Sequence, residues 1–222
     1  MSARKKFLNL NLPLLVLSLL ASVGIVFSLN TKQNINFVND YSGKYQLSKK
    51  VAYFDGQEIS VPTEIKTKNT KVLGESNPSD KWIEVDLSEQ KLRAWDGTNL
   101  FLESLVSTGL PYFPTPTGEF RIWAKLRYVR MNGGEGRYAY DLPNVPYTMF
   151  FENSETPRWK GYGLHGTYWH NSFGQVHSHG CVNLPTPVAE KLYYWVNPLL
   201  PGNKSSVILP DSNSGTRIVI HQ

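Results

Sequence analysis

The sequence of 222 residues has one cysteine, Cys181, so no disulfide bond can form within the chain. A lone thiol is either a small buried hydrophobic side chain or a reactive group. The sequence also lacks internal repeats and low-complexity blocks, which excludes a repeat architecture. Hydrophobic residues make up 41% of the chain and aromatic residues 13%, which is enough for a packed core.

Clusters of positive charge are scarce in the C-terminal two thirds of the sequence. From Lys81 onward there are 13 Lys and Arg residues against 12 Asp and Glu residues, although the whole chain has a net charge of +5. Proteins that bind nucleic acids commonly carry a basic stripe or patch. The near neutrality of this segment therefore argues against a nucleic-acid partner.

Charge is absent from residues 7–29, and basic residues occupy positions 4–6. At about 1.5 Å per residue, such a helix would extend roughly 35 Å, enough to cross a bilayer core. The basic flank predicts that residues 1–6 stay cytoplasmic and that the rest lies outside. We therefore expect residues 7–29 to anchor the chain in the cytoplasmic membrane. The alternative is a cleaved signal peptide, with residues 26–28 at the cut.

Polar residues dominate positions 30–50, and short alternating stretches follow near residues 51–61. We predict that residues 30–79 form a linker or spacer with a loosely attached hairpin. Beyond it, residues 80–222 read as one domain rich in strands. Period-two alternation and turn residues predict a β-meander and then further strands, at residues 82–87, 91–95, 100–107, 120–129, 147–151, 162–165 and 216–220.

One helix is predicted at residues 187–196, with Thr186 as its N-cap and Pro187 at its first position. An apolar stripe along it predicts that one side packs on the core. The predicted fold class is therefore mainly β (α+β), a β-sandwich with one substantial helix after the cysteine.

Histidines cluster around the single thiol: four of the five in the chain lie between residues 165 and 179. A nearby imidazole promotes the thiolate, which is the form of cysteine that attacks carbonyl groups. Gly180 would allow unusual backbone angles and close approach to Cys181. The N–H groups of Gly180 and Cys181 would then be available to hold an oxyanion. From the residues alone, both His165 and His179 remain candidates for the base.

Two other interpretations of the cluster remain. In a strand, His177, His179 and Cys181 would share one face and could bind zinc, with His165 as a fourth ligand. This spacing matches none of the common short zinc signatures. The last interpretation is a packed thiol among satisfied histidines. This interpretation is favoured for any one of these residues alone, but not for the whole group.

The same residues resemble the signature of the L,D-transpeptidase catalytic domain family. His165-Gly166-Thr167 is followed, sixteen positions after the histidine, by the cysteine of Ser178-His179-Gly180-Cys181-Val182-Asn183. Upstream, Ser107-Thr108-Gly109 and the run from Thr115 to Phe120 are similar to two other segments of this family. The resemblance covers about residues 80–221.

The resemblance implies a role for each matched residue. Cys181 would be the nucleophile that forms a thioester, and His165 would accept and return its proton. The second nitrogen of His165 would be oriented by a backbone carbonyl, that of Gly166. Ser178 and His179 would occupy supporting positions in the motif.

Three further residues are placed near the substrate by the same resemblance. Asn183 would make local hydrogen bonds near the site, and Tyr147 and Met149 would lie in a loop that borders the donor groove. We therefore expect Ser178, Asn183, Tyr147 and Met149 to contact substrate, with no metal and no cofactor.

Members of this family act on the stem peptides of bacterial peptidoglycan. The resemblance implies attack on the carbonyl of the L-centre residue of a tetrapeptide stem, release of D-alanine and transfer of the acyl group to an amine. The alternatives are an L,D-carboxypeptidase, with water as acceptor, and an inactive peptidoglycan-binding module. We expect a monomer whose catalytic domain faces the cell wall.

Overall fold

The computed structural model describes residues 40–64, 80–200 and 203–222, which belong to one compact unit of residues 37–222. The predicted anchor and the cytoplasmic N-terminus lie outside the described residues. None of the helices within the described ranges is long and apolar enough to span a membrane.

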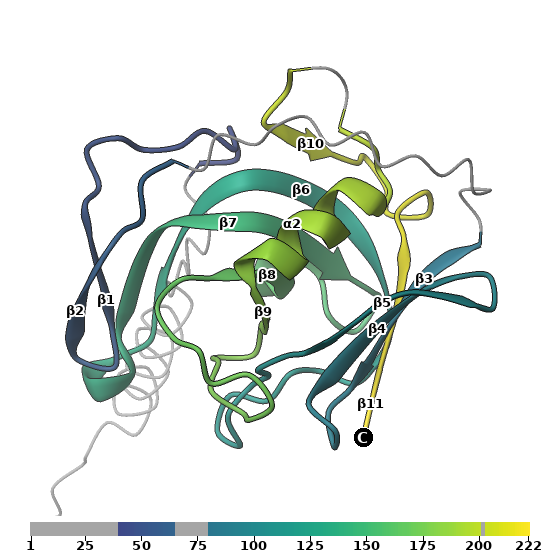
Figure 1. Cartoon of the computed structure of the whole chain (residues 1–222), viewed down its shortest axis with the longest axis horizontal. Helices are drawn as coiled ribbons and strands as arrows, with labels where there is room; N and C mark the ends of the chain where they lie inside the picture. Colours follow the sequence, from purple (N-terminus) through teal and green to yellow (C-terminus); the bar gives the residue numbers. More distant parts are fainter. Residues whose placement is uncertain (1–39, 65–79, 201–202) are drawn as a thin grey trace, which may run out of the picture. The chain divides into compact units, whose positions relative to one another are not determined.

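The described residues contain eleven strands in one hydrogen-bonded sheet, together with one α-helix and two short 3₁₀ helices (Figure 1). The main path of the sheet runs β2-β1-β7-β6-β11-β3-β4-β5, with β10 on β6, β8 on β7 and β9 on β8. The elements are β1 (Val51–Phe54), β2 (Gln57–Ser60), β3 (Lys81–Asp86), β4 (Lys91–Asp96), β5 (Asn99–Leu105), β6 (Gly118–Gly133), η1 (Gly136–Tyr138), β7 (Tyr140–Glu152), η2 (Arg158–Lys160), β8 (Gly163–Thr167), β9 (Val182–Pro185), α2 (Thr186–Trp195), β10 (Ser206–Ile208) and β11 (Arg217–His221).

The predicted meander is confirmed, because β3, β4 and β5 pair antiparallel in sequence order. The strand predicted near residue 120 is one long strand, β6, which pairs with β7 along most of its length. The short strands β9 and β10 were not predicted, since four and three residues are too few for a clear alternation.

The predicted helix is α2, and its buried side includes Leu192 and Trp195. The predicted N-cap is wrong: Pro185 holds that position, and Thr186 is the first helical residue. The Thr186 hydroxyl instead donates to the carbonyl oxygen of Thr167 at 3.2 Å, which ties the start of α2 to the end of β8. The helix therefore stabilises the strand that carries His165.

Two clusters of buried apolar residues surround the long β6–β7 pair. The larger cluster packs α2 against the sheet and contains Leu192, Ile83 and Phe151. The smaller one contains Ala52 and Phe54 of β1 together with residues of β6 and β7. The β6–β7 pair is thus buried on both faces and forms the frame of the domain.

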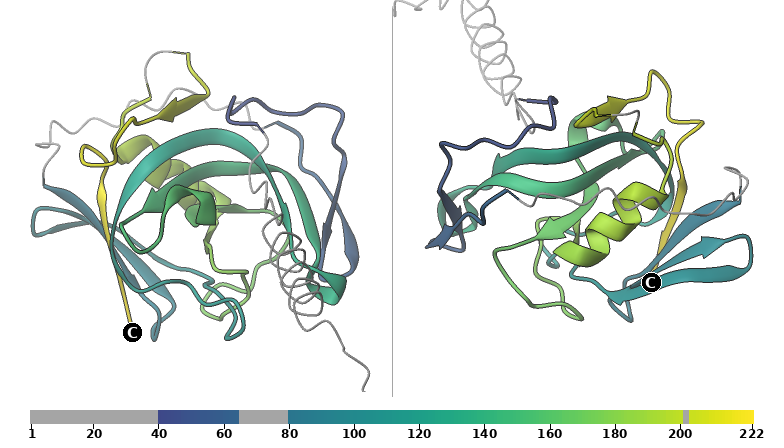
Figure 2. Two further views of the ribbon diagram at one scale, coloured as in Figure 1. Left: turned by 180° about the vertical axis from the view of Figure 1, so that it is seen from behind. Right: turned by 45° about the horizontal axis from the view of Figure 1, so that its top comes forward.

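The β1–β2 hairpin is part of this frame, contrary to the prediction of a loosely attached hairpin. Figures 1 and 2 show it beside β7, and Tyr53 of β1 pairs with Asp141 of β7. Ala52 is fully buried and Phe54 is 5% exposed. Part of the segment predicted as a spacer therefore belongs to the folded domain.

Candidate functional site

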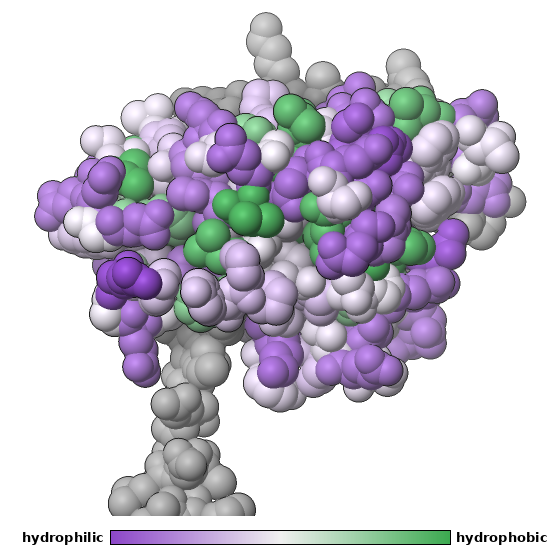
Figure 3. All heavy atoms as spheres, turned by 90° about the horizontal axis from the view of Figure 1, so that it is seen from below, coloured by the Kyte–Doolittle hydropathy of each residue, from purple (hydrophilic) through white to green (hydrophobic). Residues whose placement is uncertain are grey.

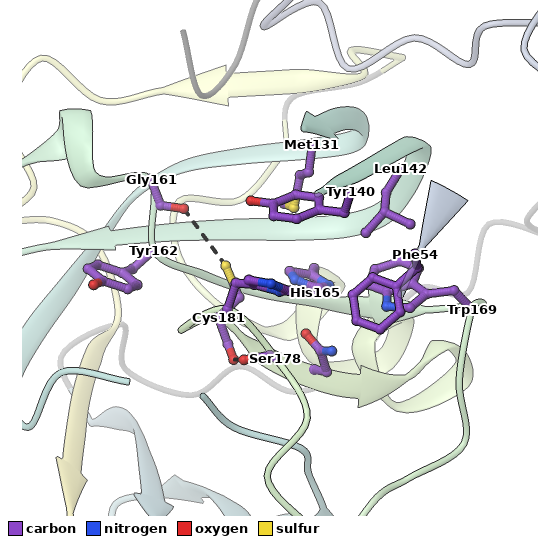
Figure 4. Close-up of a pocket in the computed structure, with 12 residues that line it drawn as sticks. Phe54, Met131, Tyr140, Leu142, Gly161, Tyr162, His165, Trp169, Ser178 and Cys181 are labelled. Carbon is purple, nitrogen blue, oxygen red and sulfur yellow. Dashed lines mark hydrogen bonds between the residues drawn. The ribbon is translucent and has the colours of Figure 1, made fainter. Parts of the chain in front are cut away.

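The site is built on two neighbouring strands, β8 and β9, which pair in parallel with His165 opposite Asn183. Because side chains alternate between the faces of a strand, His165 and Asn183 point to the same face. Cys181 lies two residues before Asn183, in the bend directly before β9. Cys181 and His165 both line one pocket, and Figure 4 draws their side chains next to each other.

The thiol of Cys181 is half-buried in this pocket. Its Sγ lies 3.9 Å from the carbonyl oxygen of Gly161, to which the thiol donates a weak hydrogen bond. Burial raises the pKa of Cys181 to about 11, and the nearby backbone amide of Gly163 partly opposes this shift. The sulfur is therefore protonated at neutral pH before substrate binds, whereas the sequence analysis pictured a thiolate.

His165 is held as a neutral base. Its Nδ1 lies 3.1 Å from the carbonyl oxygen of Gly166, which can only accept a hydrogen bond, so Nδ1 carries the proton. Its Nε2 is then free to accept one. Burial lowers the pKa of His165 to about 4, against the raising effect of the Gly166 carbonyl. The predicted contact between His165 and the Gly166 carbonyl is present.

Gly166 and Gly180 both lie where a larger residue would collide. A Cβ on Gly166 would come within 2.9 Å of Pro146. Gly180 has φ +112°, and a Cβ there would lie 2.5 Å from the ring of Tyr162. The ring of Tyr162 is thus the main reason why the residue before the cysteine must be glycine.

The hydroxyl of Ser178 fixes the turn that carries the cysteine. It donates to the carbonyl oxygen of Cys181 at 2.5 Å and accepts the N–H of Gly180 at 3.1 Å. The Gly180 N–H therefore already has a partner and is not free for an oxyanion, which corrects the sequence analysis on this donor. Ser178 lines the pocket but is 3% exposed, so its observed contacts are with the chain itself.

The upstream segments of the motif support the same turn. Thr115 accepts the N–H of Gly109 at 2.9 Å through its hydroxyl and donates to the carbonyl oxygen of Gly180 at 2.9 Å. Thr108 offers its carbonyl oxygen to the N–H groups of His177 and Ser178, both at 2.9 Å. Residues 108–115 thus hold the loop before Cys181 from one side.

His179 also lines the pocket, but aromatic rings enclose it, with those of Phe113 and Tyr140 at 4.8 and 4.9 Å. Among the described residues, its buried Nε2 has no hydrogen-bond partner. Burial lowers its pKa, and Asp55 partly opposes this. Because His165 lies beside Cys181 in the pocket (Figure 4) and its Nδ1 is fixed by Gly166, the geometry favours His165 as the base and His179 as a packed neighbour.

Asn183 makes the local hydrogen bonds that the motif implied. Its backbone exchanges two hydrogen bonds with Ser107, at 2.9 and 3.0 Å. Its side-chain amide lies 2.7 Å from Nε2 of His170. Burial, followed by repulsion from His177 and His165, lowers the pKa of His170 to about 3. Asn183 and His170 therefore form a neutral pair beside the catalytic residues.

Tyr147 and Met149 do not border a groove. Both lie in β7, both are fully buried, and both belong to the larger apolar cluster. The ring of Tyr147 packs against that of Tyr193 in α2, at 5.6 Å. The prediction that these two residues contact substrate is wrong, because both side chains are enclosed in this cluster and neither lines the pocket.

The geometric basis of the zinc interpretation is also absent. Residues 177–181 form a bent loop and not a strand, so His177 and Cys181 do not share a strand face. In the part of the chain that the structure describes, no group of three or more His, Cys, Asp or Glu residues could hold a metal ion.

Several residues of the pocket were not identified from the sequence. They are Phe54, Met131, Tyr140 and Leu142, which are aromatic or apolar, and Gly161, which lies next to the thiol. None belongs to a recognisable motif. Tyr162 and Trp169 complete the wall, and both belong to the aromatic-rich stretch 147–173, whose rings the sequence offers as possible groove-lining side chains. The cavity that they line has a volume of about 30 Å³.

A cysteine beside an imidazole whose other nitrogen is fixed by an acceptor defines the class of enzymes that transfer acyl groups through a thioester. The comparison with protein families agrees: residues 80–220 match the YkuD family, described as the L,D-transpeptidase catalytic domain. The chain belongs to this family. No curated protein matches the chain.

Solved structures of L,D-transpeptidases are similar to this chain. One from Mycobacterium smegmatis has a TM-score of 0.51 and 23% identity, over 64% of this chain and 59% of that one, and it supports the fold. The Enterococcus faecium catalytic domain acylated by ertapenem has a TM-score of 0.47 and 28% identity, over 64% and 97%. A longer E. faecium enzyme has a TM-score of 0.48 and 26% identity, over 64% and 50%. This chain thus spans between half and three fifths of the longer enzymes.

Proposed function

We propose that this protein is a peptidoglycan L,D-transpeptidase that uses Cys181 as nucleophile and His165 as general base and acid. Membership of the family supports the reaction class. The observation that carries the proposal is the placement of the two side chains in one pocket, at the start of β9 and in β8, with Nδ1 of His165 fixed by Gly166.

In the first half-reaction, Sγ of Cys181 bonds to the carbonyl carbon of the L-centre residue, and its proton passes to Nε2 of His165. Because both groups are neutral at rest, proton transfer accompanies the attack. The C–N bond to the terminal D-alanine then breaks, and the leaving nitrogen takes the proton from His165. The product is a thioester on Cys181 and free D-alanine.

In the second half-reaction, an amine of another stem attacks the thioester carbon and gives a proton to His165. The C–S bond breaks, and the sulfur takes the proton back. The thioester divides one difficult amide exchange into two easier steps. Water in place of the amine would give an L,D-carboxypeptidase with the same residues.

Residues 7–29 would place this chemistry next to its substrate. We propose that they anchor the chain in the cytoplasmic membrane, with the catalytic domain in the cell envelope facing the wall. Their charge-free composition and the basic residues at positions 4–6 support this proposal. We further propose that the domain acts as a monomer. The face drawn in Figure 3 carries apolar residues in small groups among polar ones, which supports it.

Product analysis with a defined tetrapeptide stem tests this function. We expect mass spectrometry to find free D-alanine together with a dimer joined through the L-centre residue. A tripeptide without dimer would assign the carboxypeptidase instead. The matched control is Cys181→Ala, which should give neither product. An unchanged tetrapeptide with the folded wild-type protein would favour the binding module and reject the proposal.

A further inference from the structure

One wall of the catalytic pocket comes from outside the segment that matches the family. Phe54 lies at the end of β1, in the hairpin that precedes residues 80–220, yet it lines the same pocket as Cys181 and His165. Its side chain is almost fully buried, with 5% exposed. Figure 4 shows it at the opposite end of the pocket from Gly161 and Tyr162.

A series of ring contacts leads from the catalytic histidine to this wall. The ring of His165 lies 5.6 Å from that of Trp169, and Trp169 lies 6.0 Å from Phe54. The thiol of Cys181 approaches Gly161 instead. The pocket therefore extends from the sulfur past His165 and ends at Trp169 and Phe54.

The direction of the pocket assigns a part of the substrate to this end. The leaving nitrogen must take its proton from His165, so it lies on the His165 side of the sulfur. The side chain of the residue that leaves with that nitrogen would then have the apolar end of the pocket, at Trp169 and Phe54, as a nearby wall.

The hairpin is held firmly enough to act as a fixed wall. Val61 donates its N–H to the carbonyl oxygen of Lys50 at 2.9 Å, and Tyr53 pairs with Asp141 of β7. At the tip of the hairpin, a carboxylate oxygen of Asp55 lies 3.7 Å from Nε2 of His177. Phe54 also packs against the ring of His177, at 5.5 Å.

We propose that Phe54 is a specificity-determining residue that closes the subsite for the leaving residue. This inference rests on the proposed function and names the part of the substrate that the hairpin limits. An apolar end wall fits a small apolar group, such as the methyl of alanine, and excludes a branched or aromatic side chain. The hairpin therefore sets which terminal residue is released.

The test compares donors that differ only in their terminal residue. Release of D-alanine and of D-leucine from otherwise identical tetrapeptides is measured for the wild type, for Phe54→Ala and for Tyr53→Ala. Tyr53 is the matched control, because it is the preceding residue of the same strand, is 46% exposed and does not line the pocket. We expect Phe54→Ala to reduce the preference for D-alanine by about tenfold or more, and Tyr53→Ala to retain it.

Each outcome decides a separate claim. A folded Phe54→Ala variant with the wild-type preference overturns the inference, and so does an equal rise with both donors, which would make the hairpin a mere cover. A wild type that releases neither residue rejects the proposed function itself. If thermal unfolding shows that Phe54→Ala is not folded, Phe54→Leu takes its place and should give a smaller change in the same direction.

Discussion

The β8–β9 strands with their connecting loop and the β1–β2 hairpin meet at one pocket but supply different things. The strands and loop carry Cys181, His165 and the hydrogen bonds that fix them. The hairpin carries no titratable group that lines the pocket, only the ring of Phe54. One region therefore provides the reacting atoms, and the other provides shape.

This division predicts that the two regions tolerate substitution differently. Near Cys181, Gly180 has no room for a Cβ atom. Ser178 is fixed by the hydrogen bonds of its hydroxyl group. In the hairpin, a Cβ added at Gly56 would meet no other atom within 4 Å, so this turn faces open space. We expect substitutions in the strands and loop to affect rate, and substitutions in the hairpin to affect selectivity.

The largest expected effect is that of His165→Ala. Loss of a positioned general base and acid should slow acylation of Cys181 by a donor about 10²–10⁴-fold. The matched control is His177→Gln, a histidine that contacts the hairpin and should leave the rate close to that of the wild type. Stopped-flow or quenched-flow mass measurements give both rates. Equal losses of acylation rate in the two variants would show that the two regions do not differ in this way.

A smaller effect, on the free energy of unfolding, is expected when a glycine is replaced by alanine in each of the two regions. Gly180→Ala places a Cβ against Tyr162 at φ +112°, which should reduce the free energy of unfolding by about 1–3 kcal/mol. Gly56→Ala, at φ +72° in open space, should cost less. Chemical denaturation measures both. A Gly180→Ala variant as stable as Gly56→Ala would show that the turn before Cys181 is not under this constraint.

The smallest effect is expected from pH. With a pKa of about 4 for His165 and about 11 for Cys181, neither group changes its protonation between pH 6 and 9. The acylation rate should therefore vary little over this range. Labelling of the thiol by iodoacetamide needs the thiolate and should rise about tenfold for each pH unit up to about pH 10. A labelling midpoint near pH 7 would show that the resting pair is ionised.

The sequence allowed good predictions where function depends on neighbours in the chain. The meander, the helix and the signature around Cys181 follow from local patterns, and the contact of His165 with Gly166 follows from the family resemblance. The errors concern burial by distant segments. The residues next to Tyr147 in the sequence do not indicate that its side chain is buried by other elements. Phe54 reaches the site only because β1 pairs with β7, about ninety residues further along the chain.

Intact-mass measurement of the protein after brief mixing with a tetrapeptide donor, without acceptor, tests the central claim most directly. We predict an increase equal to the mass of the donor less D-alanine, located on the peptide that contains Cys181 and lost in Cys181→Ala. If D-alanine is released without any adduct, and Cys181→Ala releases it equally well, the result contradicts a thioester on this sulfur.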